Sequence, residues 1–242
     1  MKLSLCIPLY NEEKILRDTC RTVRTYLDDR FGGDYEVIFV DDGSTDGSKK
    51  ILDELCDGIV RSISYIPNRG KGYAVRQGML AAKGDLVLFT DCDLAYGTDV
   101  IGETVALFDS DPAIGAVVGS RVKHPEGYAG YSFFLRLASK TYLRLLRFKG
   151  GLSLSDSQTG LKGFRNDAAK AIFSRCEVDR FAFDYEAIKL GELLGVKFAE
   201  LPVKIVNNRP SKIRFIRDTR RMLRDVSKTK KRLKRMKKQG KI

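Results

Sequence analysis

Short apolar runs and amphipathic stretches alternate along the first 203 residues of this 242-residue chain. Runs of about four to eight β-branched, aromatic and leucine residues predict buried strands. Between them, apolar residues recur at spacings of three and four, which predicts helices with one buried face. The predicted strands are 2–9, 35–40, 59–66, 86–90, 114–118 and 196–203, with a short strand inside 155–165. The predicted helices are 12–29, 46–55, 73–82, 99–108, 131–148, 166–174 and 183–194.

Alternating strands and helices are typical of an α/β fold. Strands that are joined through helices can pair in parallel, because a parallel pair needs a long crossover connection. We therefore expect a Rossmann-like, mostly parallel sheet with helices on both faces, formed by one domain over residues 1–211. Asn11 precedes the first helix and is expected to be its N-cap.

The segment 204–242 differs from the rest of the chain in charge. It holds 17 Lys and Arg side chains against two Asp, a net charge of +15, whereas residues 1–203 hold 27 basic and 29 acidic side chains, a net charge of −2. From residue 213 onward, apolar positions recur at helical spacing, which predicts a basic amphipathic helix. The apolar stripe consists of Ile216, Leu223, Val226, Leu233 and Met236.

Such a segment suits an anionic partner. We expect residues 212–242 to form a tail that associates with an anionic membrane surface. A nucleic-acid-binding arm is the alternative. It is disfavoured because Phe215 is the only aromatic side chain in the segment that could stack on a base, and no nucleic-acid-binding module is visible.

The predicted helix 131–148 also has a basic stripe. Arg136, Lys140, Arg144 and Arg147 follow one another at helical spacing, with Phe and Leu side chains over much of the remaining surface. A helix of this kind can lie in a membrane interface. The alternative is an ordinary surface helix with solvated charges.

Composition removes several classes of protein. The five cysteines form no CxxC pair, which favours reduced, buried thiols in an intracellular protein. The chain opens directly on a predicted strand, so no signal peptide is expected, and no apolar run is long enough to span a bilayer. His124 is the only histidine and lies in a Gly-rich stretch. A Ser/His/Asp triad and a histidine-based zinc site are therefore disfavoured.

Acidic residues follow two of the predicted strands. Asp91 and Asp93 come directly after 86–90, and Asp42 follows 35–40. The carboxyl ends of parallel strands meet at one edge of a sheet, where open α/β folds bind ligands. Two carboxylates spaced i and i+2 can hold a hard divalent cation, Mg²⁺ or Mn²⁺, against phosphate groups. The alternative is that each Asp begins a turn or caps a helix.

The glycine-rich stretch 68–72 matches no standard nucleotide fingerprint. It lacks the GxxxxGK[ST] pattern of a Walker A loop, and Val75 stands where a dinucleotide fingerprint needs its third glycine. Glycines at a helix entrance still allow backbone N–H groups to approach a phosphate or a base. Gly70 and Lys71 are therefore candidate ligand-binding residues.

Several segments together resemble the family 2 glycosyltransferases, in the same order and at similar separations. They are Ile7-Pro8-Leu9-Tyr10-Asn11-Glu12, Val40-Asp41-Asp42-Gly43-Ser44-Thr45-Asp46-Gly47-Ser48, Asn68-Arg69-Gly70-Lys71-Gly72 and Asp91-Cys92-Asp93. Three later segments are similar to the polyprenyl-phosphate branch, which contains the dolichyl-phosphate mannosyltransferases and β-glucosyltransferases. They are Gly119-Ser120-Arg121, Asp156-Ser157-Gln158-Thr159-Gly160-Leu161-Lys162 and Phe181-Ala182-Phe183-Asp184-Tyr185-Glu186.

The resemblance implies a GT-A fold, a nucleotide-sugar donor, a polyprenyl-phosphate acceptor and inversion at the sugar carbon. Asp91 and Asp93 are then expected to hold Mg²⁺ or Mn²⁺ against the donor diphosphate. Asp93, Arg121 and Asp156 are the implied catalytic residues. The implied donor-binding residues are Pro8, Tyr10, Asn11, Glu12, Asp42, Gly70, Lys71, Asp91, Gln158 and Lys212.

The acceptor phosphate is expected to contact Arg121, because an Arg fork matches phosphate geometry and keeps its charge. Arg136 or Lys140 is expected to supply a second cation. Asp184 and Glu186 either border the reacting centre or serve as helix caps.

Two departures from the family pattern bear on the donor. Mannosyltransferase relatives carry Gln two residues after the second metal-binding Asp, where this chain has Ala95. The expected donor is therefore a UDP-sugar, with glucose as the hexose, used at the cytoplasmic face of a membrane. GDP-mannose, or a donor-binding protein without turnover, is the alternative. Arg209 stands closer to the pair Ser211-Lys212 than in mannosyltransferases, which leaves the contact of Lys212 with the donor phosphates open.

Overall fold

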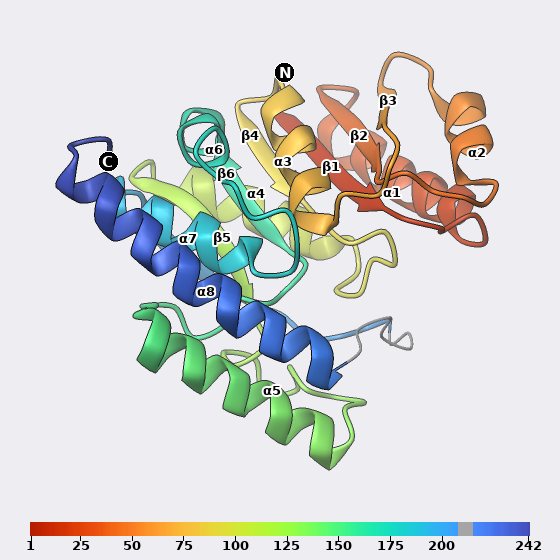
Figure 1. Ribbon diagram of the computed structural model, residues 1–242. Coiled ribbons are helices and arrows are strands. Elements are labelled where there is room, and N and C mark those ends of the chain that lie inside the picture. The colour runs from red at the N-terminus through yellow and green to blue at the C-terminus, as the bar shows by residue number, and fades with distance from the viewer. Residues whose placement is uncertain (208–214) are drawn as a thin grey trace.

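A mixed sheet forms the centre of the molecule (Figure 1). The computed structural model describes residues 1–207 and 215–242, with the side chains of all of these except residues 134, 135, 149 and 215–220. Within this part of the chain, a seven-stranded sheet has the order β3-β2-β1-β4-β6-β5-β7. The strands are β1 (Leu3–Leu9), β2 (Tyr35–Asp41), β3 (Val60–Ser64), β4 (Leu86–Phe89), β5 (Ile114–Ser120), β6 (Lys162–Arg165) and β7 (Lys197–Pro202).

The expected mostly parallel sheet is confirmed. The strands β1 to β4 pair in parallel, as do β5 and β7, and only β6 runs antiparallel to its neighbours β4 and β5. Each parallel connection passes through a helix, as the alternating pattern of the sequence requires. Every residue of β1 and β2 is buried, because helices cover both faces of the sheet.

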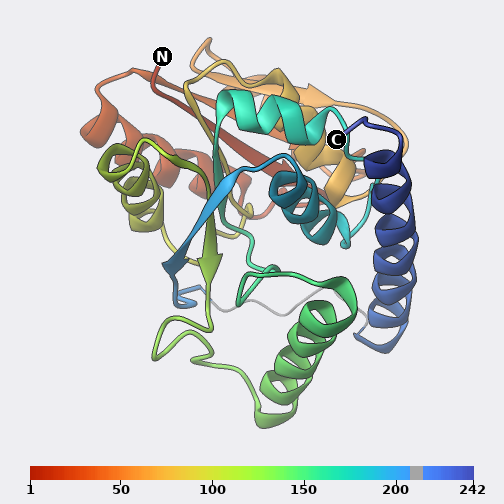
Figure 2. The ribbon, with the colours of Figure 1, turned by 90° about the vertical axis from the view of Figure 1, so that its left-hand side faces the viewer.

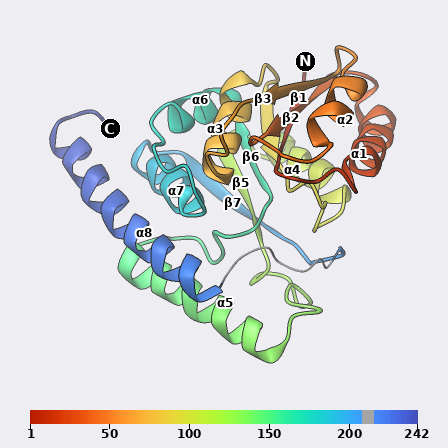
Figure 3. The same cartoon turned by 45° about the vertical axis from the view of Figure 1, so that its right-hand side comes forward.

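Helices pack on both faces of the sheet (Figures 1 and 2). The helices α1 (Leu16–Phe31), α2 (Ser48–Leu55) and α4 (Asp99–Ser110) share one apolar core with the sheet. The helices α3 (Lys71–Ala81), α6 (Asn166–Phe173) and α7 (Phe183–Leu193) share the other. Beyond α7 lie α5 (Phe133–Leu145), the π-helical turn η1 (Leu146–Gly150) and α8 (Phe215–Lys238), seen together in Figure 3.

Helix α3 lies unusually close to the sheet, and a glycine permits this. A Cβ atom on Gly78 would stand 3.1 Å from both Cys6 Cβ and Val40 Cγ2. With no Cβ at this position, the backbone of α3 packs directly over β1 and β2. The N-terminus of α3, with Lys71, is thereby held at the carboxyl edge of the sheet.

Asn11 does not cap the first helix. Helix α1 begins at Leu16, with Ile15 at the N-cap position and no side-chain cap. Asn11 instead has a φ of 55° and its Oδ1 accepts a hydrogen bond from the Thr45 backbone N–H at 2.8 Å. Its own N–H donates to Ser44 Oγ at 2.9 Å. The asparagine therefore joins two loops, because its side chain tolerates the left-handed conformation and bonds backbone groups there.

Two side chains of the apolar stripe on α8, Val226 and Leu233, face the protein rather than a membrane. Val226 and Leu233 are each only 3% exposed. Val226 packs in a cluster with Leu146 of η1, and Leu233 joins the core that α6 and α7 form. The expectation that this stripe contacts lipid is thus wrong for these side chains, because they cover apolar surface on the body. The boundary at residue 211 stays a prediction.

Two further expectations concern membrane-spanning segments and the cysteine thiols. Among the described residues, no helix is both long enough and apolar enough to cross a bilayer. The five cysteines carry unpaired thiols, of which only Cys56 is exposed.

The burial of Leu233 in α8 predicts that this side chain contributes to the stability of the fold. Replacing Leu233 with Ala should lower the free energy of unfolding by about 2–4 kcal/mol, because the substitution leaves a cavity in a closed core. The exposed neighbour Lys234 is the control. Lys234→Ala should change the free energy of unfolding by less than about 0.5 kcal/mol. Chemical denaturation of the full chain measures both. Equal stabilities for the two variants would show that α8 does not pack on the body.

Candidate functional site

Three loops meet at the carboxyl ends of β1, β2 and β3. The loop 10–12 is joined to the loop 42–48, since Glu12 N–H donates to Ser48 Oγ at 3.0 Å. The loop 42–48 in turn lies against 68–72, because a Cβ on Gly43 would stand 2.8 Å from the Asn68 nitrogen. Pro8, Tyr10, Glu12, Asp42 and Gly70, all expected to bind the donor, are therefore brought to one edge of the sheet.

Asp42 fixes the entrance of α3. Its Oδ1 accepts a hydrogen bond from Arg69 N–H at 2.8 Å, and its Oδ2 accepts one from Gly70 N–H at 2.8 Å. Gly70 has a φ of 109°, and a Cβ there would stand 2.5 Å from the Asp179 carbonyl oxygen, so only glycine fits. The buried carboxylate thus shapes the loop and, with about four acceptor positions, can still accept from a ligand.

Asp91 and Asp93 lie at the same edge, just beyond β4. Lys71 Nζ stands 2.5 Å from Asp91 Oδ1. Burial lowers the pKa of Lys71, but the carboxylates of Asp91, Asp184 and Asp93 outweigh it and the pKa is raised. The amine is therefore fully charged near neutral pH. Burial and the charge of Asp91 raise the pKa of Asp93.

A second ion pair, which is buried, lies close to the first. The Lys162 side chain is fully buried, and its Nζ lies 2.6 Å from Asp184 Oδ1 and 2.8 Å from the Thr159 carbonyl oxygen. Burial raises the pKa of Asp184, while Lys162 and Lys71 oppose that shift. The charges of Asp91, Lys71, Asp184 and Lys162 therefore alternate in sign across the site, and Asp93 adds a second negative charge next to Asp91.

This arrangement fits a divalent cation that shares its coordination with a ligand. Asp91 and Asp93 supply carboxylate oxygens, and a cation already lies against Asp91 in the form of Lys71. The part of the chain described contains no group of three or more side chains that could enclose a metal ion. Mg²⁺ is commonly bound in this way, through one or two carboxylates completed by substrate phosphates and water.

The loop 156–160 connects this acidic edge to a buried arginine. Gly160 lies directly against the Asp91 carboxylate, which a Cβ at this position would overlap. At the other end of the loop, Asp156 accepts hydrogen bonds from Arg121 Nε at 2.8 Å and Arg121 Nη2 at 3.1 Å. Arg121 lowers the pKa of Asp156 against the effect of burial. Gln158 lies between, its N–H bonded to Asp156 Oδ1.

Three cations surround one tyrosine ring near Asp156. The charged groups of Arg121, Arg136 and Lys140 stand 5.5, 5.9 and 5.7 Å from the centre of the Tyr128 ring. Arg121 Nη1 also donates to the Tyr131 hydroxyl at 3.2 Å. Cation–π contacts stabilise each cation by about 0.5–2 kcal/mol, which offsets part of the repulsion between them.

Some expected residues fall outside this arrangement. Lys212 and Arg209 lie outside the described residues. Glu186 does not reach the sheet edge. Its carboxylate accepts from the Val178 N–H at 2.8 Å and pairs with Arg232 of α8 at 2.5 Å, so it supports the helix packing.

Sequence reasoning missed three contributors to the site. Lys162 carried a weak signal, a lysine inside a predicted strand, whereas Tyr128 and Tyr131 carried none.

Gly160 offers a direct test of this geometry. Gly160→Ala should lower the free energy of unfolding by about 1–3 kcal/mol, because the added methyl group must displace the Asp91 carboxylate. Gly119→Ala is the matched control, since the nearest atom to its Cβ would be Thr159 Oγ1 at 3.3 Å, and its cost should be clearly smaller. Denaturant unfolding compares them, and a harmless Gly160→Ala would show that the loop does not contact Asp91.

Comparison with known proteins identifies relatives over most of the chain. Human dolichyl-phosphate beta-glucosyltransferase is 34% identical over 88% of this chain and 69% of its own length. The Drosophila melanogaster protein of the same name is 35% identical over 84% of this chain and 67% of its own. The Saccharomyces cerevisiae protein of that name is 28% identical over 93% of this chain and 72% of its own.

Solved structures show the same fold. Mycobacterium tuberculosis glucosyl-3-phosphoglycerate synthase, crystallised with Mn²⁺, UDP and glucosyl-3-phosphoglycerate, has a TM-score of 0.68 at 19% identity, covering 94% of this chain and 78% of that one. Rubrobacter xylanophilus mannosyl-3-phosphoglycerate synthase has a TM-score of 0.68 at 18% identity, and the match covers 100% of this chain and 76% of that one. The expected GT-A fold is confirmed by these neighbours. The family model described as "Glycosyl transferase family 2" matches residues 4–173, and the chain therefore belongs to this family of enzymes.

Proposed function

We propose that this enzyme transfers glucose from UDP-glucose to a polyprenyl phosphate, of the dolichyl phosphate class, with inversion at C1 of the sugar. The relatives at 34% and 35% identity carry the name dolichyl-phosphate beta-glucosyltransferase, which supports both the hexose and the acceptor. The donor nucleotide, the divalent cation and action at the cytoplasmic face of a membrane are parts of the same proposal.

The observation that carries the acceptor assignment is the charge around Tyr128. Arg121, Arg136 and Lys140 converge on this ring, and among the residues whose side chains are described, only Asp156 forms an ion pair with one of them. About two positive charges are left without compensation. A phosphate monoester carries about −1.5 to −2 charges at neutral pH, so a polyprenyl phosphate would neutralise the cluster.

Helix α5, which carries Arg136 and Lys140, also offers a place for the polyprenyl chain. On α5 and η1, Phe133 is 74% exposed, Leu137 53% and Phe148 89%. Leu137 lies one turn from Phe133 on the face that also presents Arg136 and Lys140. Exposed apolar side chains flanked by cations suit the interface of an anionic bilayer. This helix, rather than the buried Val226 and Leu233 of α8, would then contact lipid.

The chemistry needs little proton transfer. The acceptor phosphate is already an anion, so one of its oxygens can attack C1 of the sugar directly. The bond from C1 to the nucleoside diphosphate breaks as the new C1–O bond forms on the opposite face, which inverts the configuration. Arg121, Arg136 and Lys140 hold the attacking phosphate and Asp156 fixes the orientation of Arg121, so positioning supplies much of the rate.

On the donor side, the diphosphate would lie between Gly70 and the acidic pair. Asp91 and Asp93 would hold Mg²⁺ or Mn²⁺, which would stabilise the charge on the departing nucleoside diphosphate. Lys71, already charged beside Asp91, would contribute a second positive group. Base and ribose would lie over Pro8, Tyr10, Asn11, Glu12 and Asp42, with Gln158 and Lys212 near the sugar and phosphates.

A donor screen tests the nucleotide and the sugar together. With a short-chain polyprenyl phosphate and Mn²⁺, UDP-glucose should give a glycosylated lipid, and GDP-mannose should give at least about tenfold less product, because Ala95 occupies the position of the mannosyltransferase Gln. Product is measured by mass spectrometry. Turnover of GDP-mannose in the absence of turnover of UDP-glucose would reverse the donor assignment.

Removing the cations on α5 tests the acceptor site. Arg136→Gln combined with Lys140→Gln should raise KM for the polyprenyl phosphate at least about tenfold and leave KM for UDP-glucose nearly unchanged.

The matched control removes the same charge from the same basic stripe. Arg144→Gln combined with Arg147→Gln leaves the Tyr128 cluster intact and should change KM for the acceptor by less than about threefold. Equal effects of the two double variants would mean that the acceptor phosphate is not held at Tyr128.

A further inference from the structure

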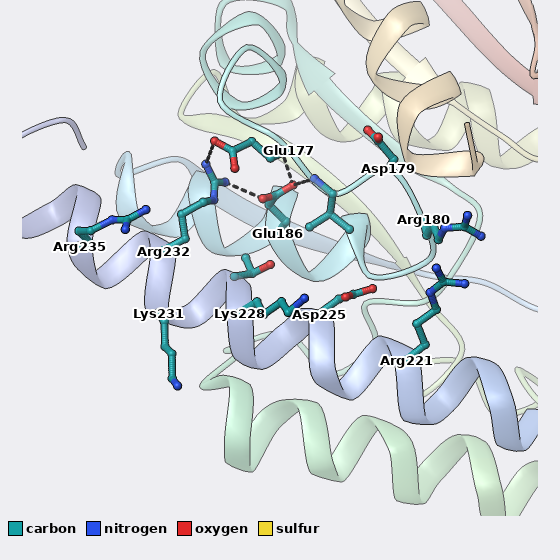
Figure 4. Close-up of a pocket in the computed structure, with 12 residues that line it drawn as sticks. Glu177, Asp179, Arg180, Glu186, Arg221, Asp225, Lys228, Lys231, Arg232 and Arg235 are labelled. Atoms are coloured by element: carbon teal, nitrogen blue, oxygen red, sulfur yellow. Dashed lines mark hydrogen bonds and ion pairs between the residues drawn. The ribbon is translucent and has the colours of Figure 1, made fainter. Parts of the chain in front are cut away.

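A charged groove lies between α8 and the segment 177–180 that precedes α7 (Figure 4). Its volume is about 560 Å³, within the usual range of small-ligand sites. Arg221, Lys228 and Arg235 of α8 line one wall, and Arg180 lines the other. The groove is not part of the donor or acceptor site proposed above.

Three of the four carboxylates that line the groove already take part in ion pairs. Glu177 and Glu186 both pair with Arg232, at 2.8 and 2.5 Å. Asp179 pairs with Arg76 of α3 at 2.6 Å. Asp225 is the remaining acid of the lining.

The basic side chains are in excess. Within the described part of the chain, no ion pair joins Arg180, Arg221, Lys228 or Arg235 to a carboxylate. Over the whole lining, six Lys and Arg side chains stand against four Asp and Glu side chains, so the groove has a net charge of +2.

The orientation of two arginines defines the centre of the site. Figure 4 shows Arg221 extending from α8 toward Arg180, with the two guanidinium groups on the same end of the groove. Like charges that point toward one another repel, and an anion placed between them removes that repulsion. We propose that this groove is a phosphate-binding site in which Arg180 and Arg221 grip one phosphate group from opposite walls.

Phosphate is the anion that suits this geometry best. Two planar guanidinium groups present paired N–H donors that match the oxygens of a phosphate, and the buried hydroxyl-bearing Thr229 adds a polar group to the lining. The phosphate has two sources, the headgroup of an anionic phospholipid or a soluble phosphate compound. The open groove beside the basic face of α8 admits both.

The groove shares a wall with the loop that begins α3. The Asp179 carbonyl oxygen accepts a hydrogen bond from Tyr73 N–H at 3.1 Å, and a Cβ on Gly70 would stand 3.2 Å from Arg180 Cγ. A phosphate that orders Arg180 would therefore act on the support of Gly70 and Lys71.

The experiment uses the full chain in EDTA, which removes divalent cations from the acidic edge. Pyrophosphate is titrated calorimetrically in one arm. Phosphatidylcholine vesicles with and without phosphatidic acid are used for co-sedimentation in the other. Arg180→Gln combined with Arg221→Gln should weaken binding at least about tenfold in the arm that reports the natural source. Arg221→Gln alone leaves the segment 177–180 unchanged and should weaken binding in that arm at least about threefold.

The matched control keeps the groove and removes the same charge from α8. Arg224 and Lys234 are exposed and do not line the groove, so Arg224→Gln combined with Lys234→Gln should weaken binding less than about threefold. Loss confined to the vesicle arm identifies a lipid headgroup, and loss in the pyrophosphate arm identifies a soluble phosphate. Equal losses for the groove and control variants, or no binding by the wild type in either arm, would overturn the proposal.

Discussion

Alternating charges at the carboxyl edge of the sheet hold the side chains of the candidate site together. Lys71 pairs with Asp91 and Lys162 with Asp184, at 2.5 and 2.6 Å, although these residues come from four different segments of the chain. Lys162 is fully buried, and an unpaired charge there would cost several kcal/mol, so Lys162 requires Asp184. The acidic pair that begins with Asp91 stays ordered at the sheet edge because of this network.

A shared loop couples that edge to the second cluster. The segment 156–160 touches Asp91 through Gly160 and holds Arg121 through Asp156. One short piece of backbone therefore positions both the Asp91 carboxylate and the Arg121 guanidinium group. In the proposed function, the two substrates, one bound through its diphosphate and one through its phosphate, would meet here with little chain movement between their sites.

The fold was predictable because its signal is periodic. Alternating buried strands and amphipathic helices fix the parallel sheet whatever the details of the loops. Helix starts were less predictable. Asn11 has the right residue type for an N-cap, but its hydrogen bond to Thr45 in a distant loop decides its conformation. The stripe on α8 shows the same limit, since an amphipathic pattern cannot tell whether Leu233 faces lipid or protein.

The candidate site was predictable only where motifs carry it. Asp91 and Asp93 follow a strand and were visible from their spacing, and Arg121 came from the family resemblance. Tyr128 could not be found in this way. It gathers three cations from two different segments, and that role exists only once the chain has folded.

The most direct measurement is a crystal structure with UDP, Mn²⁺ and a short-chain polyprenyl phosphate. The diphosphate and Mn²⁺ are expected against Asp91 and Asp93, and the lipid phosphate between Arg121 and the α5 cations beside Tyr128. A lipid phosphate bound elsewhere, with the Tyr128 cluster left without an anion, would contradict the proposed transfer to a polyprenyl phosphate.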